Sequence, residues 1–299
     1  MDFYPSSLEK GVRSEQALKL ALAEMYVQGV STRKVSAIVE ELCGHSVSST
    51  QVSQCAARLD AELQSWRDRP LGACPYMILD ARYEKVRQGG QLLDCAILIA
   101  LGIGLDRKRS ILGVSVALSE AEVHWREFLL SLQSRGLTGC RFIVSDAHPG
   151  LAAARMAVFP SVPWQRCQFH LAQNAQALVP RIEMRSRVAY DIRSIFNAPD
   201  LPSALARLKE LVLFYSKSAP KLAAWMEANI PEAHQRRMRT SNALERVNQE
   251  LKRRTRVASC FPNEASLLRL VSALLSEISD EWITGKIYLN MNPSDSPTS

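Results

Sequence analysis

An aspartate inside an apolar run is the first residue of this sequence that could do chemistry. Asp80 lies in the segment YMILDA (76–81), whose near-continuous apolar residues are typical of a central strand covered on both faces. A carboxylate buried there needs a positive partner. The sequence offers Arg82 or Arg87 nearby, or a bound metal ion, and the segment alone does not decide among them.

Two further acidic positions have both a plain and a functional interpretation. Asp146 ends a predicted strand just before a predicted helix, where an aspartate commonly caps the helix, but where open α/β sheets also gather their sites. Glu245 lies on a predicted helix and, with Asn242, has the spacing of a capping box. Glu250 is a rival carboxylate on the same helix, and helical periodicity does not choose between the two glutamates.

Two aspartates and a later glutamate are residue types suited to binding divalent metal ions. Phosphoryl transfer between DNA strands can use two metal ions about 3.5–4 Å apart, one activating the attacking water or 3′-hydroxyl and the other stabilising the leaving oxygen. Mg²⁺ prefers oxygen ligands and keeps several waters, so two or three carboxylates suffice. We therefore hypothesise a site for two Mg²⁺ or Mn²⁺ ions held by Asp80, Asp146 and a helical glutamate.

The predicted elements that would position these carboxylates change in kind along the chain. Residues 14–66 have helical periodicity, and their outline fits a helix-turn-helix as well as a plain helical hairpin. Strands are predicted at 75–81, 92–103, 110–118, 141–145 and 162–165, and helices at 120–134 and 150–158. This order is that of a ribonuclease-H-like core, so we expect an α/β fold with a mixed sheet flanked by helices.

After Cys167 the strand signal disappears, and the chain becomes helical with breaks at five prolines: Pro180, Pro199, Pro202, Pro220 and Pro231. Two further helices are predicted at 241–254 and 263–282, and the polar C-terminal end is predicted to be disordered. The expected regions are an N-terminal helical region (1–68), a catalytic core (69–166 with 239–285), an all-helical insertion (167–238) and a disordered tail (286–299).

The composition is that of a basic, globular protein. The formal net charge is +7, which favours polyanionic partners, although a modestly basic cytosolic protein fits this value equally well. Seven scattered cysteines without paired spacing favour reduced thiols. No signal peptide or membrane span is expected, because the longest apolar stretch, around 95–103, is too short. We expect a cytoplasmic protein that does not bind membranes.

Basic segments flank the helix that carries Glu245, at 235–240 and 251–256. Acidic partners are sparse in these segments, so DNA phosphate contact is favoured over the alternative of a solvated helix face paired with glutamates. The expected DNA contacts are Arg82, Arg87, His148, Arg239, Arg246, Lys252, Arg253 and Arg254. His148 and Trp164 could stack on a displaced base, although core packing is favoured for Trp164.

Several blocks of sequence together resemble the Mutator-type transposases of bacterial insertion sequences. The blocks occur in that family's order from about residue 29 to 290, and their combination is specific where each alone is not. They are GVSTRKV (29–35), WRDRPL (66–71), LDARYEKVR (79–87), VSDAHPGL (144–151), WQRCQFH (164–170), TSNALERVNQE (240–250) and FPN (261–263).

The resemblance implies a ribonuclease-H-like catalytic domain with an Asp-Asp-Glu triad and a helical insertion before the glutamate. The triad falls on Asp80, Asp146 and Glu245, which favours Glu245 over Glu250. Cys167 and His170 match the family's Cys-x-x-His signature. As zinc ligands they would make half a site, with no second pair at suitable spacing, so we expect a structural role or support for DNA positioning.

The implied activity is DNA transposition, with metal-dependent cleavage at element ends followed by strand transfer from the freed 3′-hydroxyl. Its partners would be double-stranded DNA, both terminal inverted repeats and target, with at least a homodimer in the active complex and association with the bacterial nucleoid. Members usually have a longer N-terminal region, so a truncated, catalytically idle DNA-binding remnant that regulates full-length transposase is the alternative. The match of many blocks disfavours an unrelated metal nuclease.

Overall fold

The computed structural model describes residues 25, 30, 32–43, 48–52, 60–230, 242–256 and 260–285. Five strands form a single sheet within these ranges, in the order β3-β2-β1-β4-β5. Strands β1, β2 and β3 pair antiparallel, whereas β1, β4 and β5 are parallel. The sheet is therefore mixed, as expected for the ribonuclease-H-like core. The strand bounds are β1 (Tyr76–Gln88), β2 (Gln91–Ile103), β3 (Arg109–Ala117), β4 (Phe142–Ser145) and β5 (Trp164–Arg166).

Strand β1 is longer than the sequence indicated, since the predicted strand ended at residue 81 and the observed one continues to Gln88. Its charged second half pairs with the start of β2, which satisfies the backbone although the apolar pattern has ended. Gly89 and Gly90 join the two strands with φ values of 56° and 81°. Two consecutive positive φ angles are the requirement of a tight hairpin turn, and glycine adopts them without strain.

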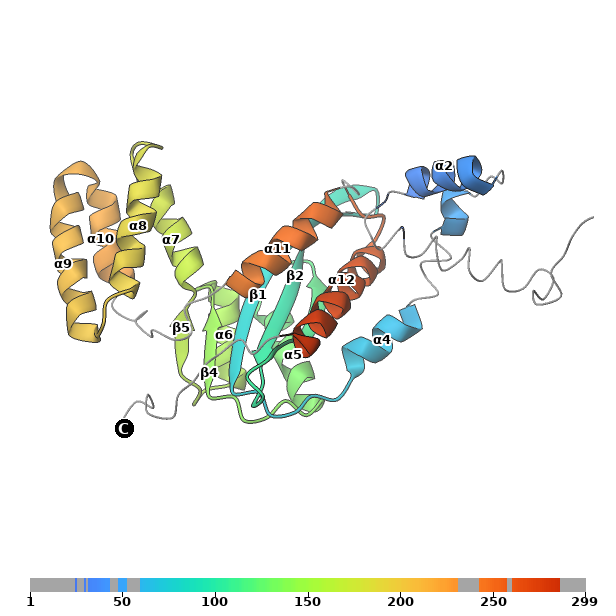
Figure 1. Ribbon diagram of the computed structural model, residues 1–299, viewed down its shortest axis with the longest axis horizontal. Coiled ribbons are helices and arrows are strands. Elements are labelled where there is room, and N and C mark those ends of the chain that lie inside the picture. The colour runs from blue at the N-terminus through green and yellow to red at the C-terminus, as the bar shows by residue number, and fades with distance from the viewer. Residues whose placement is uncertain are drawn as a thin grey trace, which may run out of the picture.

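Helices cover both faces of the sheet (Figure 1). The helices α5 (Glu122–Ser134) and α6 (Pro149–Val158) pack on the face that carries Met77 and Leu79. The opposite face, which carries Ile78 and Val86, packs against α11 (Asn242–Thr255) and α12 (Glu264–Thr284). Because alternate strand residues point to opposite faces, the even-numbered residues of β1 lie under α11 and α12.

The C-terminal helix α12 connects the sheet to the N-terminal region. Its N-cap Asn263 accepts a hydrogen bond from the backbone N–H of Ser266. Arg269 on α12 donates two hydrogen bonds, of 2.7 and 2.8 Å, to the carboxylate of Asp60. Asp60 begins α4 (Asp60–Asp68), the described end of the third predicted N-terminal helix. The chain that joins α4 to β1 therefore starts beside α12.

The N-terminal helix α2 (Thr32–Cys43) confirms the second predicted helix. Its Val35 and Val39 form a small apolar cluster with Val52. The first predicted helix lies outside the described residues except for Met25. Helical structure at 49–52 and in α4 agrees with the third predicted helix, whose residues 53–59 also lie outside them.

Four helices after β5 form a bundle with its own apolar core, which stands beside the sheet in Figure 1. These helices are α7 (Gln168–Ala177), α8 (Met184–Phe196), α9 (Leu201–Ser218) and α10 (Pro220–Asn229). Pro202 and Pro220 lie in the first turns of α9 and α10, so they begin helices and do not break them. Pro180 and Pro199 lie between helices as predicted, and Pro231 is outside the described residues.

No helix in the described part of the chain is both long and apolar enough to cross a membrane. The cysteines whose side chains are described are free thiols.

Candidate active site

Asp80 lies on the α11-covered face of β1 with only 3% of its surface exposed. Its Oδ2 accepts a 2.6 Å hydrogen bond from Nδ2 of Asn248 on α11. Its Oδ1 is 3.7 Å from Nε2 of His170 on α7. The cationic partner of this carboxylate is therefore His170, and the sequence-based candidates Arg82 and Arg87 do not fill that role.

Burial raises the pKa of Asp80, and the contacts with His170 and Asn248 offset this effect only in part. Burial also disfavours charge on His170, but the neighbouring Cys167 thiol and the Asp80 carboxylate raise the pKa of His170 to about 9. A protonated His170 thus stabilises the charged form of Asp80. The charged form of Asp80 is still disfavoured beside this partner. A further positive charge nearby would therefore stabilise it.

Asp146 follows the last residue of β4, and its surroundings differ from those of Asp80. The parallel strands pair Leu79 with Ser145, so Asp80 and Asp146 are the next residues along two neighbouring strands. The side chain of Asp146 is 37% exposed, and its Oδ1 lies 4.0 Å from Nε of Arg166 on β5. Its negative charge is one of the influences that raise the pKa of Asp80, which reflects how close the two carboxylates are.

Asp146 does not cap the following helix. The N-cap of α6 is His148, and no side chain makes a capping hydrogen bond there. The Oδ1 of Asp146 instead accepts a 2.7 Å hydrogen bond from the backbone N–H of Ala147. The capping interpretation of this aspartate is therefore wrong.

The helix position of Glu245 is described, whereas its side chain lies outside the described part of the structure. Position 245 precedes Asn248 by three residues, and residues at that spacing share a helix face. Position 250 is two residues beyond Asn248, about 200° around the helix, on the opposite face. Since Asn248 contacts Asp80, position 245 is on the face of α11 that is turned to the sheet, and position 250 is on the opposite face.

The side chains around Asp80 and Asp146 fit a hard divalent cation. Both carboxylates supply oxygen ligands, the type that Mg²⁺ and Mn²⁺ prefer. Several buried polar atoms beside them have no hydrogen-bond partner: Oδ1 of Asn248, Nδ1 of His170 and Nε of Arg166. The side chains that the structure describes, which do not include that of Glu245, contain no group of three His, Cys, Asp or Glu that could hold a metal ion. Two aspartates plus position 245 therefore remain the candidate ligand set.

Cys167 and His170 lie at the junction of β5 and α7. Cys167 is buried at the N-cap of α7, and its backbone N–H donates to the carbonyl of Ser145. His170, one turn later, contacts Asp80. Sequence reasoning missed this contact and that of Asn248, because both join residues far apart in the chain. The position of the Cys-x-x-His signature just after a predicted strand end was the one available signal for His170.

The residues expected to bind DNA near the hairpin have different surroundings. Arg82 turns inwards, where its NH2 group lies 2.7 Å from the Glu84 carboxylate and its NH1 group lies 3.4 Å from the backbone oxygen of Asn248. Arg87 is exposed near the β1–β2 turn. His148 is partly exposed, with Nδ1 3.9 Å from the carboxylate of Glu120.

Trp164, in contrast, packs against the apolar cluster of the α5–α6 face and donates a 2.8 Å hydrogen bond to Oγ of Ser145. The expected core role of Trp164 is thus confirmed.

The basic end of α11 has more acidic neighbours than the sequence indicated. Arg253 and Arg254 form ion pairs of 2.7 and 2.8 Å with Glu250, and Arg254 lies 3.6 Å from Glu277 on α12. The expectation that acidic partners are sparse is therefore wrong here, because Glu250 on α11 itself pairs with both arginines and α12 adds Glu277, which is distant in sequence. Arg246 and Lys252 are exposed, and Arg239 lies outside the described residues.

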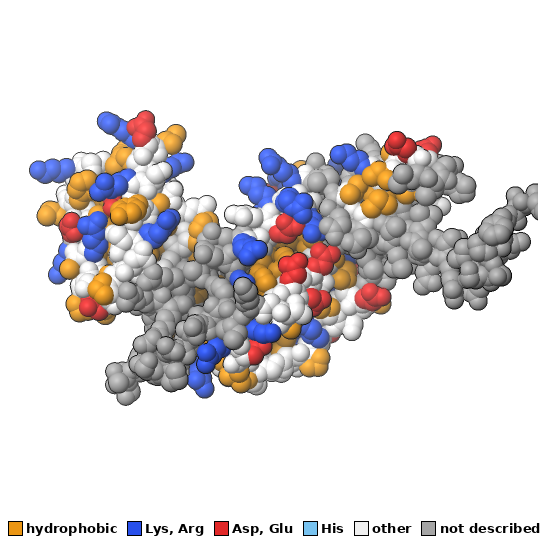
Figure 2. Space-filling model, in the orientation of Figure 1, with side chains coloured by type: hydrophobic (Ala, Val, Ile, Leu, Met, Phe, Trp, Pro, Cys, Tyr) orange, Lys and Arg blue, Asp and Glu red, His pale blue; other side chains and the backbone are white. Residues whose placement is uncertain are grey.

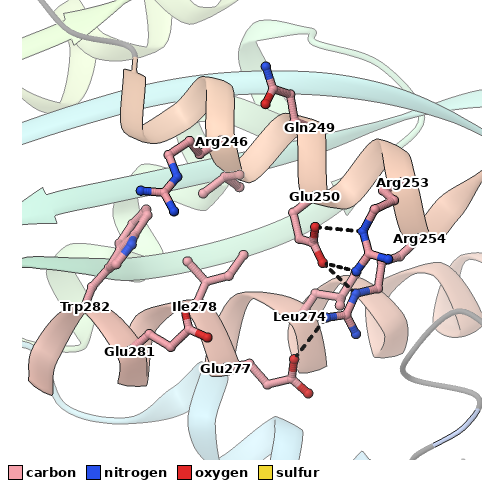
Figure 3. A pocket seen from close by; sticks show the side chains of 11 residues that line it. Arg246, Gln249, Glu250, Arg253, Arg254, Leu274, Glu277, Ile278, Glu281 and Trp282 are labelled. Atoms are coloured by element: carbon pink, nitrogen blue, oxygen red, sulfur yellow. Dashed lines mark hydrogen bonds and ion pairs between the residues drawn. The ribbon is translucent and has the colours of Figure 1, made fainter. Parts of the chain in front are cut away.

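A hollow of about 410 Å³ lies between α11 and α12, on the side of α11 away from Asn248 (Figure 3). Leu274, Ile278 and Trp282 give it an apolar floor, and the guanidinium of Arg246 points towards Trp282. Lys and Arg side chains gather along α11 in the space-filling view, with Asp and Glu beside them (Figure 2). Because side chains of both charges line this hollow, it differs from the candidate site around Asp80 and Asp146.

Comparison with known proteins gives consistent matches over nearly the whole chain. The family model described as "Transposase, Mutator family" matches residues 2–285. The transposase for insertion sequence element IS406 of Burkholderia multivorans is 60% identical, over 98% of this chain and 78% of that protein. The transposase of ISRM5 of Rhizobium meliloti is 43% identical (97% and 75%), and that of IS256 in transposon Tn4001 of Staphylococcus aureus is 37% identical (97% and 77%).

Proposed function

The chain belongs to the Mutator family of transposases, and from this premise we propose that it cleaves and joins DNA at insertion-sequence ends with an Asp80–Asp146–Glu245 triad. The observation that carries the proposal is the placement of Asp80 on β1 beside Asp146, which follows the neighbouring parallel strand β4, with α11 packed over Asp80. This arrangement brings two carboxylates from distant segments of the chain close together, next to the helix that carries Glu245.

Each side chain of the proposed site has a role that follows from its surroundings. Asp80, buried and held by Asn248, and Asp146, half-exposed, would bind Mg²⁺ or Mn²⁺ together with Glu245. When bound, two such ions activate the attacking hydroxyl and stabilise the leaving oxygen. His170 keeps positive charge beside Asp80, and Arg166 supplies a cation near Asp146.

The proposed substrate is double-stranded DNA, both the terminal inverted repeats of the element and the target. Joining two element ends requires both to be held in one complex, so we propose at least a homodimer. The net charge of +7 supports binding to a polyanion, and Arg87, Arg246 and Lys252 are exposed basic residues suited to phosphate contact.

The proposal is tested by incubating a labelled, pre-nicked DNA that contains an element end with Mg²⁺ or Mn²⁺. Native chain should cleave or join it, and Glu245→Gln, Asp80→Asn and Asp146→Asn should lose that activity while retaining DNA affinity. Glu250→Gln is the matched control, since it changes a glutamate on the opposite face of the same helix and should stay active. Activity that survives in Glu245→Gln but not in Glu250→Gln would reverse the assignment. DNA binding without cleavage by every form, native included, would favour a non-catalytic DNA-binding protein.

A further inference from the structure

A continuous line of polar contacts joins the buried face of β1 to α11. Asp80, Arg82 and Glu84 alternate along that face, so all three side chains lie under the helix. Asn248 and Thr255 are two helical turns apart on α11 and point down at them. Asn248 donates to Asp80 at 2.6 Å, and Oγ1 of Thr255 donates to Glu84 at 2.8 Å.

Asn248 makes contacts at both its side chain and its backbone. Its amide nitrogen binds the Asp80 carboxylate, and its backbone oxygen accepts the 3.4 Å contact from Arg82. Arg82 in turn donates a 2.8 Å hydrogen bond to Glu84, which the Thr255 hydroxyl also contacts. Any shift of α11 along β1 would break these contacts together, so they determine the register of the helix against the strand.

The carbonyl oxygen of the Asn248 side chain is buried and has no hydrogen-bond partner among the described residues. Buried polar atoms are rarely left unpaired, because each has lost its contacts with water. The contribution of Asn248 at this position is therefore polar and not apolar packing. The Asp80 oxygen that it contacts is Oδ2, so Oδ1 remains towards His170 and the open end of the site.

We propose that Asn248 is a positioning residue of the site, orienting the Asp80 carboxylate and fixing α11 so that position 245 lies beside it. This inference rests on the proposed function, in which both acidic residues bind a divalent cation. Hydrogen-bond partners of metal-binding carboxylates hold their ligands in the binding orientation, and losing one typically costs about 10- to 100-fold in metal affinity or activity. Asn248 acts through Asp80 and does not itself contact the reacting atoms.

The test compares Asn248→Ala and Asn248→Leu with the native chain. Leucine is branched at the same carbon as asparagine and is larger, but it forms no hydrogen bond, so together with the smaller alanine it separates packing from orientation. Gln249→Ala is the matched control, because it alters the adjacent, exposed residue on the same helix. Binding of Mn²⁺ is followed by electron paramagnetic resonance, cleavage is measured against Mg²⁺ concentration, and circular dichroism reports folding.

Both Asn248 variants should bind Mn²⁺ about 10- to 100-fold more weakly and lose cleavage rate by a similar factor, with DNA affinity and helical content unchanged. If Asn248→Ala does not fold, the leucine variant still decides. Native-like Mn²⁺ affinity and cleavage in the leucine variant would overturn the role of Asn248 alone. A native chain that neither binds Mn²⁺ nor cleaves DNA would overturn the proposed function and this inference with it.

Discussion

Asp80 and Asp146 carry the same side chain in different surroundings. The Asp80 side chain is 4% exposed and the Asp146 side chain 37%, although the two residues lie side by side, Asp80 on β1 and Asp146 directly after β4. Removing a carboxylate from water is costly, and the histidine beside Asp80 only partly offsets that cost. In the absence of a cation, the buried carboxylate of Asp80 should therefore lower the stability of the folded chain.

Asp80→Asn should accordingly stabilise the metal-free chain by about 1 kcal/mol. Burial raises the pKa of Asp80 on folding, so above the pKa of the unfolded chain its charge disfavours the folded state, and removing that charge stabilises it at neutral pH. Asp146→Asn should change stability by less than about 0.5 kcal/mol. Urea unfolding in EDTA measures both variants, and a less stable Asp80→Asn would mean that the His170 contact outweighs burial.

Glu250 gives a stability contribution that depends on pH. Hydrogen bonds from Arg253, and also from Arg254, lower the pKa of Glu250 to about 2 from 4.5. A carboxylate whose pKa falls on folding stabilises the fold above the unfolded pKa and loses that effect as the pH drops towards the folded pKa. Glu250→Gln should therefore be less stable than native by up to about 1 kcal/mol at pH 7.

That difference should shrink as the pH falls below about 4.5, and thermal unfolding at pH 7, 5 and 3.5 would follow it. A difference that does not change with pH would assign the effect of the substitution to packing in the hollow between α11 and α12.

The sequence predicted the three carboxylates but not their neighbours. Asp80 stood out because a charge interrupts an apolar strand, and that signal is local. The contact of Asn248 with Asp80 spans 168 residues, and the Glu277 contact with Arg254 crosses between two helices. Such contacts depend on how α11 is placed against β1 and α12, and no local pattern of residue types encodes that placement.

At the scale of elements, periodicity and order predicted the sheet well and its exact extent less well. The order of strands and helices between residues 75 and 166 was sufficient to predict the mixed sheet, because each buried strand is an apolar run in the sequence. The second half of β1 was missed because its charged residues interrupt the apolar run, although they continue the pairing with β2. Pro202 and Pro220 were interpreted as breaks in the helical region, and each lies in the first turn of a helix.

The helices α8 and α9 are joined by a buried polar cluster that should be important for their stability. Asp191 on α8 is fully buried and accepts hydrogen bonds of 2.6 Å from the Tyr215 hydroxyl and 2.9 Å from Arg187. Tyr215→Phe removes one donor and leaves the carboxylate less well satisfied, so it should destabilise the chain by about 1–3 kcal/mol.

Tyr190→Phe, on the exposed side of α8, is the control and should change stability by less than about 0.5 kcal/mol. Urea unfolding compares the two variants. Equal, small effects would show that the Tyr215 hydroxyl is not needed by the buried carboxylate.

At the scale of the whole molecule, the basic side chains differ in whether an acidic residue already pairs with them, and so in how readily they can bind DNA. Along α11, Lys252 has no ion pair among the described residues, whereas Arg253 is paired with Glu250. Lys252→Gln should therefore weaken DNA binding and reduce the slope of log affinity against log salt by about 1, the value expected for one lost phosphate contact.

Arg253→Gln should change that slope less. Fluorescence anisotropy of a labelled duplex between 50 and 300 mM salt, as an approximate range, measures the slopes. Equal changes would indicate that the Arg253–Glu250 pair opens on DNA.

The placement of α11 after every strand of the described sheet also has a consequence for the timing of synthesis. Asn248 follows Asp80 by 168 residues, so at ribosomal rates of about 5–20 residues per second the helix emerges roughly 10–30 s after β1. A nascent chain then presents both aspartates long before the segment that would complete their site. Under the proposed chemistry, a nascent chain that has not yet reached α11 cannot cut the DNA near which it is made.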